Sequence, residues 1–80
     1  MAEQFPSISG IIEEALAGYR VTIFLRAPAR FDGVKLIMIG ADTVDQARGI
    51  VSEIAREFSI AEASIKVEIR MFDRGRPKGP

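Results

Sequence analysis

The sequence of 80 residues contains neither histidine nor cysteine, which narrows the chemistry open to its side chains. Thiol catalysis, thiolate metal sites and disulfides are excluded, and acid–base chemistry would fall to Asp, Glu, Lys or Tyr. Asp42 and Asp45 stand three residues apart, and two such carboxylates can bind a cation or stabilise the start of a helix. We favour the helix start. The composition therefore predicts a protein that is not an enzyme and that holds no metal ion or cofactor.

The C-terminal stretch FDRGRPKGP carries the second candidate chemistry, with cations at Arg74, Arg76 and Lys78. Its core, Arg-Gly-Arg-Pro, resembles an AT-hook, which lays an extended backbone and two Arg side chains along a narrow A·T minor groove. Asp73 places a negative charge where a hook prefers Pro or a base. Three alternatives stay open: a hook for A·T-rich DNA, a general basic arm for RNA or DNA, and a solvated end.

Length predicts one small domain over residues 1–72, followed by a basic Pro- and Gly-rich tail over 73–80 that we expect to be disordered. A core of this size is marginal, so we expect a homodimer or a larger protein complex. No stretch approaches the roughly 20 apolar residues that cross a bilayer, and no signal peptide is evident. We therefore expect a cytoplasmic protein with no membrane contact.

Two segments show the spacing of amphipathic helices. Residues 8–17 place apolar side chains at i, i+3, i+4, i+7 and i+8, with Ser7 available as N-cap and Gly18 as the residue that ends the helix. Residues 44–58 carry a second apolar stripe, preceded by Thr43 and Gln46 at capping-box spacing. The sequence thus predicts helices over about 8–17 and 44–58.

Three further segments alternate apolar and polar side chains, as strands do: RVTIFLR, GVKLIMI and SIKVEIRMF. Pro28 and Asp32-Gly33 between the first two predict a hairpin with an elaborated connection. The segment SIAEAS before the last strand is at most one helical turn. The order helix-strand-strand-helix-strand predicts an α+β open-faced sandwich, a ferredoxin-like variant with two helices on one face of a three-stranded sheet.

The other face of that sheet is the most informative predicted surface. Alternation assigns to it Arg20, Thr22, Phe24 and Arg26 from the first strand, Lys35, Ile37 and Ile39 from the second, and Lys66, Glu68, Arg70 and Phe72 from the third. Aromatic rings among cations are typical of single-stranded RNA platforms, because bases stack on the rings while cations contact phosphates. The sequence therefore predicts a nucleic-acid surface made of Arg20, Phe24, Arg26, Lys35, Lys66, Arg70, Arg74, Arg76 and Lys78.

A second interpretation assigns the same face to protein contacts. Four of its side chains are more apolar than a solvated face needs, and a small domain can bury such a patch against a partner or a copy of itself. This alternative predicts an interface made of Phe24, Ile37, Ile39 and Phe72. Both uses could coexist, with the apolar seam central and the cations at its rim.

The stretches GIIEEAL, VTIFLRAPARF and VKLIMIGADTVDQARGIVSEI together resemble the C-terminal α/β domain of the alpha subunit of archaeal and eukaryotic translation initiation factor 2. The likeness covers about residues 8–70 and is specific at the corner Ala27-Pro28-Ala29-Arg30-Phe31, although the family domain begins with a further strand. It implies a βαββαβ-type fold that docks onto a larger translation component without catalysis. The rhythm of ARGIVSEIAREF and IKVEIRMF is also similar to Alba-type chromatin proteins.

From these observations we expect a small non-enzymatic binding module that associates with nucleic acid or with a ribonucleoprotein, through the sheet face and the basic tail. The alternative is a protein-interaction subunit or homodimerising module with no nucleic-acid contact.

Overall fold

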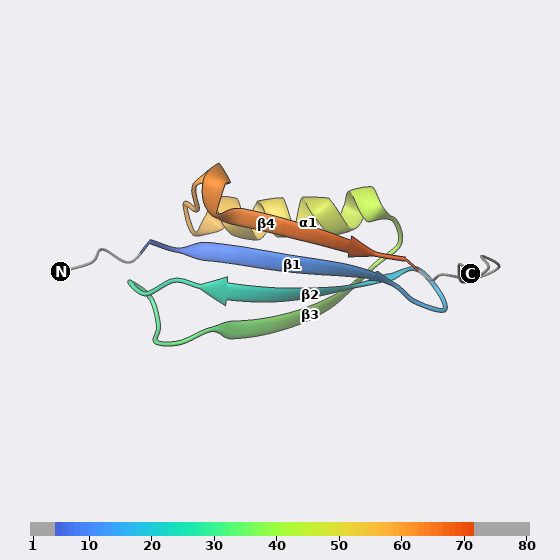
Figure 1. The fold of residues 1–80 in the computed structure, drawn as a ribbon, viewed down its shortest axis with the longest axis horizontal. Coiled ribbons are helices and arrows are strands. Elements are labelled where there is room, and N and C mark those ends of the chain that lie inside the picture. The colour runs from blue at the N-terminus through green and yellow to red at the C-terminus, as the bar shows by residue number, and fades with distance from the viewer. Residues whose placement is uncertain (1–4, 72–80) are drawn as a thin grey trace, which may run out of the picture.

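The computed structural model describes residues 5–71. The chain forms the strands β1 (Ser7–Glu14), β2 (Tyr19–Arg26) and β3 (Lys35–Ala41), the helix α1 (Val44–Glu57), a 3-10 turn (Glu62–Ser64) and the strand β4 (Ile65–Arg70). The strands make one sheet in the order β3-β2-β1-β4 (Figure 1). β1 and β2, and β2 and β3, pair antiparallel, whereas β1 and β4 pair parallel.

The predicted helix over 8–17 is wrong, because this segment is the central strand β1. Ile8 and Ile12, four residues apart, lie on one face in a helix and also in a strand, so their spacing fits both structures. β-branched isoleucines favour the strand. Leu16, the end of the supposed helical stripe, is 101% exposed. Gly18 does adopt a left-handed φ of 90°, but in the turn between β1 and β2.

The predicted architecture of two helices on a three-stranded sheet is therefore also wrong. The described order is β-β-β-α-β, with one α-helix on a four-stranded mixed sheet. The first segment joins the sheet because it pairs with β2 on one side and with β4 on the other. Among residues 5–71, α1 covers one face and no element covers the opposite face, which we call the open face.

The core lies between α1 and the sheet. Its largest fully buried side chains come mainly from β1 and β2, whereas α1 contributes mostly small residues that let the helix approach the strands. The buried cluster consists of Ile8, Ile12, Val21, Ile23, Leu25, Ala41, Ala47, Val51, Ala55 and Ile60. Burying this apolar surface is the main term that favours the fold.

The predicted helix over 44–58 is confirmed as α1, with its caps. The Thr43 hydroxyl accepts a hydrogen bond from the backbone N–H of Gln46 at 3.0 Å, and the Gln46 side chain accepts one from the backbone N–H of Asp42. At the other end Ser59 adopts a left-handed φ of 55°. The N–H groups of Ser59 and Ile60 donate to the last turn of the helix, which is a Schellman ending.

Candidate interaction surface

The strand register arranges the open face in cross-strand rows. One row runs from Leu36 through Phe24 and Ser9 to Lys66, and the next from Met38 through Thr22 and Ile11 to Glu68. A third row runs from Gly40 through Arg20 and Glu13 to Arg70. Each row starts apolar or neutral on β3 and ends charged on β4. The open face is thus divided into a β3 half and a β4 half of different chemistry.

The β3 half is an exposed apolar patch made of Phe24, Leu36 and Met38, which we call the β3 patch. Leu36 is 57% and Met38 59% exposed, and Phe24, directly across from Leu36, is 40% exposed. Apolar side chains that lie together at the surface of a small protein mark a site of association more often than isolated ones do. The β3 patch is therefore the strongest candidate for contact with another molecule.

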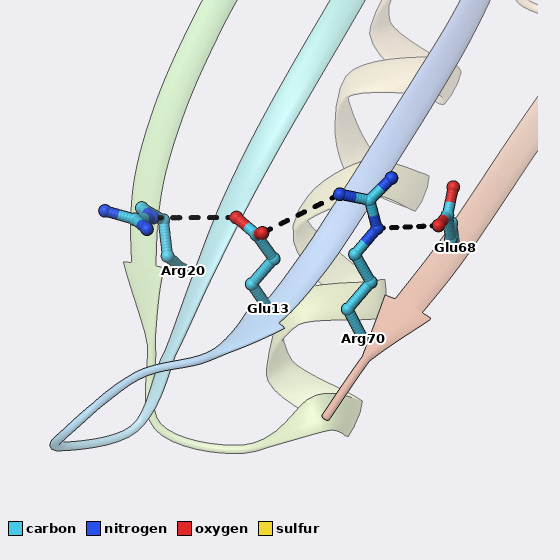
Figure 2. Close-up of polar contacts among 4 residues, drawn as sticks. All are labelled: Glu13, Arg20, Glu68 and Arg70. Carbon is cyan, nitrogen blue, oxygen red and sulfur yellow. Dashed lines mark hydrogen bonds and ion pairs between the residues drawn. The ribbon is translucent and has the colours of Figure 1, made fainter. Parts of the chain in front are cut away.

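A chain of four charges crosses the open face from Arg20 on β2 through Glu13 on β1 to Arg70 and Glu68 on β4 (Figure 2). Glu13 lies between Arg20 and Arg70, its direct cross-strand neighbours, with carboxylate oxygens 3.8 Å from Arg20 Nε and 3.9 Å from Arg70 Nη1. Arg70 Nε also donates a hydrogen bond of 2.7 Å to the Glu68 carboxylate. This bond and the charge of Glu68 raise the pKa of Arg70 above its usual value. Two arginines of the face are thus already matched by carboxylates of the same face.

The structure places most of the predicted nucleic-acid residues together. Arg20, Phe24, Arg26, Lys66 and Arg70 all belong to the open face by alternation and register. Lys35 instead lies on the helix side of β3, where its Nζ is 5.6 Å from the centre of the Phe31 ring. The remaining predicted contacts, Arg74, Arg76 and Lys78, lie outside the described residues, as does the whole tail over 73–80.

The predicted partner interface needs a correction on β3. Phe24 is on the open face, but Ile37 and Ile39 are half-buried on the helix side and pack against the core. Leu36 and Met38 occupy the open face in their place. The error arises because positions 36–39 are all apolar, so alternation cannot tell which side faces the core. Phe72 lies outside the described residues.

A second exposed apolar strip, missed in the sequence, lies on the helix side of the sheet along β4. Val67 is 42% and Ile69 36% exposed, and Met71, directly after the strand, is 55% exposed. The apolar alternation of this strand predicted a covered face, but α1 packs over β1, β2 and β3 and leaves β4 largely bare. Only the position of the helix across the sheet could reveal this strip.

Among residues 5–71 the sheet has two free edges, β3 and β4, which differ in character. β3 carries one charge, Lys35 at its start, and contains no proline. β4 alternates Lys66, Glu68 and Arg70 along its open-face side. Charged side chains on an edge strand discourage pairing with further strands, whereas an apolar edge without them invites it. The edge of β3 is therefore the one open to a partner strand.

Two hollows lie on the described surface. One of about 310 Å³ is lined by Phe5, Pro6, Ser59, Ala61 and Ser64. Another of about 480 Å³ lies along α1 beside Glu53, Ile54, Arg56 and Glu57. Within residues 5–71 no three acidic side chains come together as a metal site would need, and no helix is long and apolar enough to span a membrane.

Functional inference for this chain rests on the geometry of the open face and not on a similar protein. No protein-family model matches the chain, and neither a curated protein nor a solved structure matches it. The resemblances to the initiation-factor domain and to Alba-type proteins therefore stay predictions.

Proposed function

We propose that this chain is a non-catalytic protein-interaction module that binds a protein partner through the β3 patch and the adjoining edge of β3. The observation that carries the proposal is the contiguity of Phe24, Leu36 and Met38 at β3, whose outer edge pairs with no other strand among residues 5–71. A partner strand added to that edge would satisfy its free backbone groups, and the part of the partner that extends over the open face would cover the patch. Recognition of this kind needs no catalytic group.

Burial supplies the driving force. Full burial of a Leu, Met or Phe side chain contributes about 1.5–3 kcal/mol, and these three side chains are roughly half exposed. Covering the β3 patch would therefore contribute on the order of 3 kcal/mol, before the backbone hydrogen bonds of the edge are added. Part of this gain offsets the entropy lost on association.

The charges of the open face favour a protein over a nucleic acid. Glu13 and Glu68 hold Arg20 and Arg70, and both carboxylates point out from the same face (Figure 2). A phosphate approaching either arginine would meet a carboxylate beside it, and like charges repel. A protein partner can match both signs at once.

Two methionines of similar exposure provide the test. Met38, 59% exposed, lies in the β3 patch, and Met71, 55% exposed, directly follows β4. Both should oxidise at similar rates with peroxide in dilute purified protein, because thioether oxidation follows exposure. In an extract of the cells that make the protein, we expect Met38 to oxidise several-fold more slowly than Met71, before and after nuclease treatment. Mass spectrometry of the two peptides measures the ratio.

Each result of this experiment decides between alternatives. Equal oxidation of Met38 and Met71 in the extract means that nothing covers the patch, and the proposal fails. Protection that disappears with nuclease means that nucleic acid covers the face.

A second candidate function is nucleic-acid binding, supported by the surroundings of Phe24. Arg26 follows it by two residues on the same face, and Lys66 lies in its cross-strand row. Neither cation is paired with a carboxylate among the described residues. A base stacked on Phe24 could have its phosphates contacted by both cations.

The nucleic-acid function predicts a specific salt dependence of binding. Two phosphate contacts predict that the logarithm of the association constant for single strands falls with the logarithm of salt concentration at a slope of about −1.4. Fluorescence titration of a labelled oligonucleotide at two salt concentrations measures that slope. The Phe24→Leu variant, which keeps an apolar side chain but removes the ring, should weaken binding with little change in the slope. If the wild type does not bind, this second function fails.

A further inference from the structure

Gly40 is a residue that the single chain does not require. It lies on β3 with no φ in the left-handed range, and a Cβ built on it would meet no atom within 4 Å. Glycine inside a strand costs stability and is common where another backbone or ligand approaches closely. The space beside Gly40 on the open face is therefore available to an incoming group, at the edge that carries least charge.

The geometry points to a second copy of this chain as the occupant of that edge. We propose that β3 pairs antiparallel with β3 of the second copy, about a two-fold axis that is normal to the sheet and passes beside Met38. This inference rests on the proposed function, because it names the partner that the edge of β3 binds. The two four-stranded sheets would become one sheet of eight strands.

The register follows from the two-fold axis. Because the axis passes beside residue 38, Met38 faces Met38 of the second copy. Residues equally far before and after it face each other, so Leu36 faces Gly40 of the second copy. Opposite positions have the same parity, so open-face residues meet open-face residues and Ile37 and Ile39 meet each other on the helix side. Leu36, 57% exposed in the single chain, would occupy the space that Gly40 leaves.

Charge also fits this arrangement. Lys35, the one charge within β3, would lie across from Ala41 of the second copy. The two Lys35 residues would then be about six residues apart along the paired strands, roughly 20 Å. At that separation their repulsion is screened by salt, whereas a parallel pairing would place them side by side.

The pairing also closes the assembly. In the dimer both β3 edges are paired, and the two β4 strands form the outer edges of the sheet. Along these strands Lys66, Glu68 and Arg70 alternate with apolar residues. Edges of that kind resist further strand addition. A two-fold dimer, and not a fibre, is therefore the expected end point.

Sedimentation equilibrium and amide hydrogen exchange together test the dimer. The wild type should show a concentration-dependent mass that reaches twice that of the chain. At high concentration the amides of alternate β3 residues should exchange more slowly than at low concentration, while those of β4 should not change, because only β3 gains backbone partners. A monomer at millimolar concentration, or slowing in β4 instead of β3, overturns the proposal.

Two variants with matched controls locate the contact. Gly40→Val should raise the dimer dissociation constant about tenfold or more by filling the space for Leu36, while the melting temperature of the dilute monomer stays or rises. Thr22→Val, on the same face but one strand inward, should leave the dimer intact. Met38→Lys should abolish the dimer, whereas Met71→Lys, at a similarly exposed methionine, should not.

The outcomes separate this inference from the proposed function. If Met38→Lys abolishes the dimer but Gly40→Val does not weaken it, the copies associate without the predicted edge pairing and the inference is wrong. If the purified protein is monomeric while Met38 is protected in the cell extract, the proposed function stands and the second copy is excluded as partner. If the purified protein is monomeric and Met38 is unprotected in the cell extract as well, both the proposed function and the dimer are wrong.

Discussion

Gly10 of β1 lies directly beneath Val51 of α1, so close that a Cβ on Gly10 would be 2.8 Å from Val51 Cγ2. The helix can approach the centre of the sheet because position 10 has no side chain. Val51 is itself fully buried and its branched side chain has few alternative rotamers. The contact therefore determines how deeply α1 packs on the sheet.

Replacing Gly10 with alanine should lower the free energy of unfolding by about 1–3 kcal/mol, because the new methyl group overpacks the interface. Chemical denaturation measures the loss. The double variant Gly10→Ala with Val51→Ala should lose less than the sum of the two single variants. Gly49→Ala is the control: it lies in α1 with no atom near its built Cβ, and it should stabilise the protein by about 0.5–1 kcal/mol. Additive losses in the double variant would contradict the contact.

The left-handed residue at the end of α1 offers a stabilising change. Ser59 has a φ of 55°, which glycine adopts without strain. Ser59→Gly should raise the free energy of unfolding by up to about 1 kcal/mol, and Ser59→Val should lower it by more than that. Thermal melts of the three proteins check the order. A valine variant as stable as the wild type would show that the Schellman ending does not persist in solution.

The strands should tolerate core truncation less well than α1. Ile23 on β2 is fully buried, whereas Ile54 on the helix is only partly buried. Ile23→Ala is expected to lower the free energy of unfolding by about 2–5 kcal/mol, and a domain of this size is then expected not to stay folded. Ile54→Ala should cost less. Urea midpoints of the two variants, with circular dichroism as the signal, test the difference, and equal losses would place the centre of the core elsewhere.

Glu13 is the central residue of the charge network formed with Arg20, Arg70 and Glu68, and replacing it tests the network. Glu13→Gln removes the carboxylate that Arg20 and Arg70 share, and it should change the free energy of unfolding by less than about 1 kcal/mol because both arginines are exposed and Glu13 is only half-buried. If the open face binds single-stranded nucleic acid, as the second candidate function requires, the variant should bind it more tightly at low salt, since the face loses a negative charge. Unchanged affinity would show that the charge network does not meet phosphate.

The tail over 73–80 remains open to a separate test. If it is a nucleic-acid arm, deleting residues 74–80 should reduce the salt slope of binding by about two to three units, because three cations leave with it. A hook should prefer A·T-rich duplex and lose that preference in the Arg76→Ala variant. Equal binding by the truncated and intact chains would make the tail a solvated end.

Local sequence was sufficient where one segment carries its own signals. Thr43 and Gln46 predicted the start of α1, and the stripe through Ala47, Val51 and Ala55 predicted its buried side. Along β2 apolar and polar side chains alternate over most of the strand, so Arg20, Thr22 and Phe24 were placed on the correct face without knowledge of the neighbouring strands. In these segments the period of the pattern is unambiguous and agrees with the residue propensities.

Tertiary structure decided what local patterns left ambiguous. A spacing of four residues between Ile8 and Ile12 suits helix and strand alike, and pairing with β2 and β4 selects the strand. The apolar run of β3 does not by itself show which of its side chains face the core. Its register with β2 places Met38 on the open face. Glu13 meets Arg20 and Arg70 because three strands come together, an arrangement made by backbone hydrogen bonds between distant segments. The apolar patch and the charge network of the open face therefore exist only in the folded sheet.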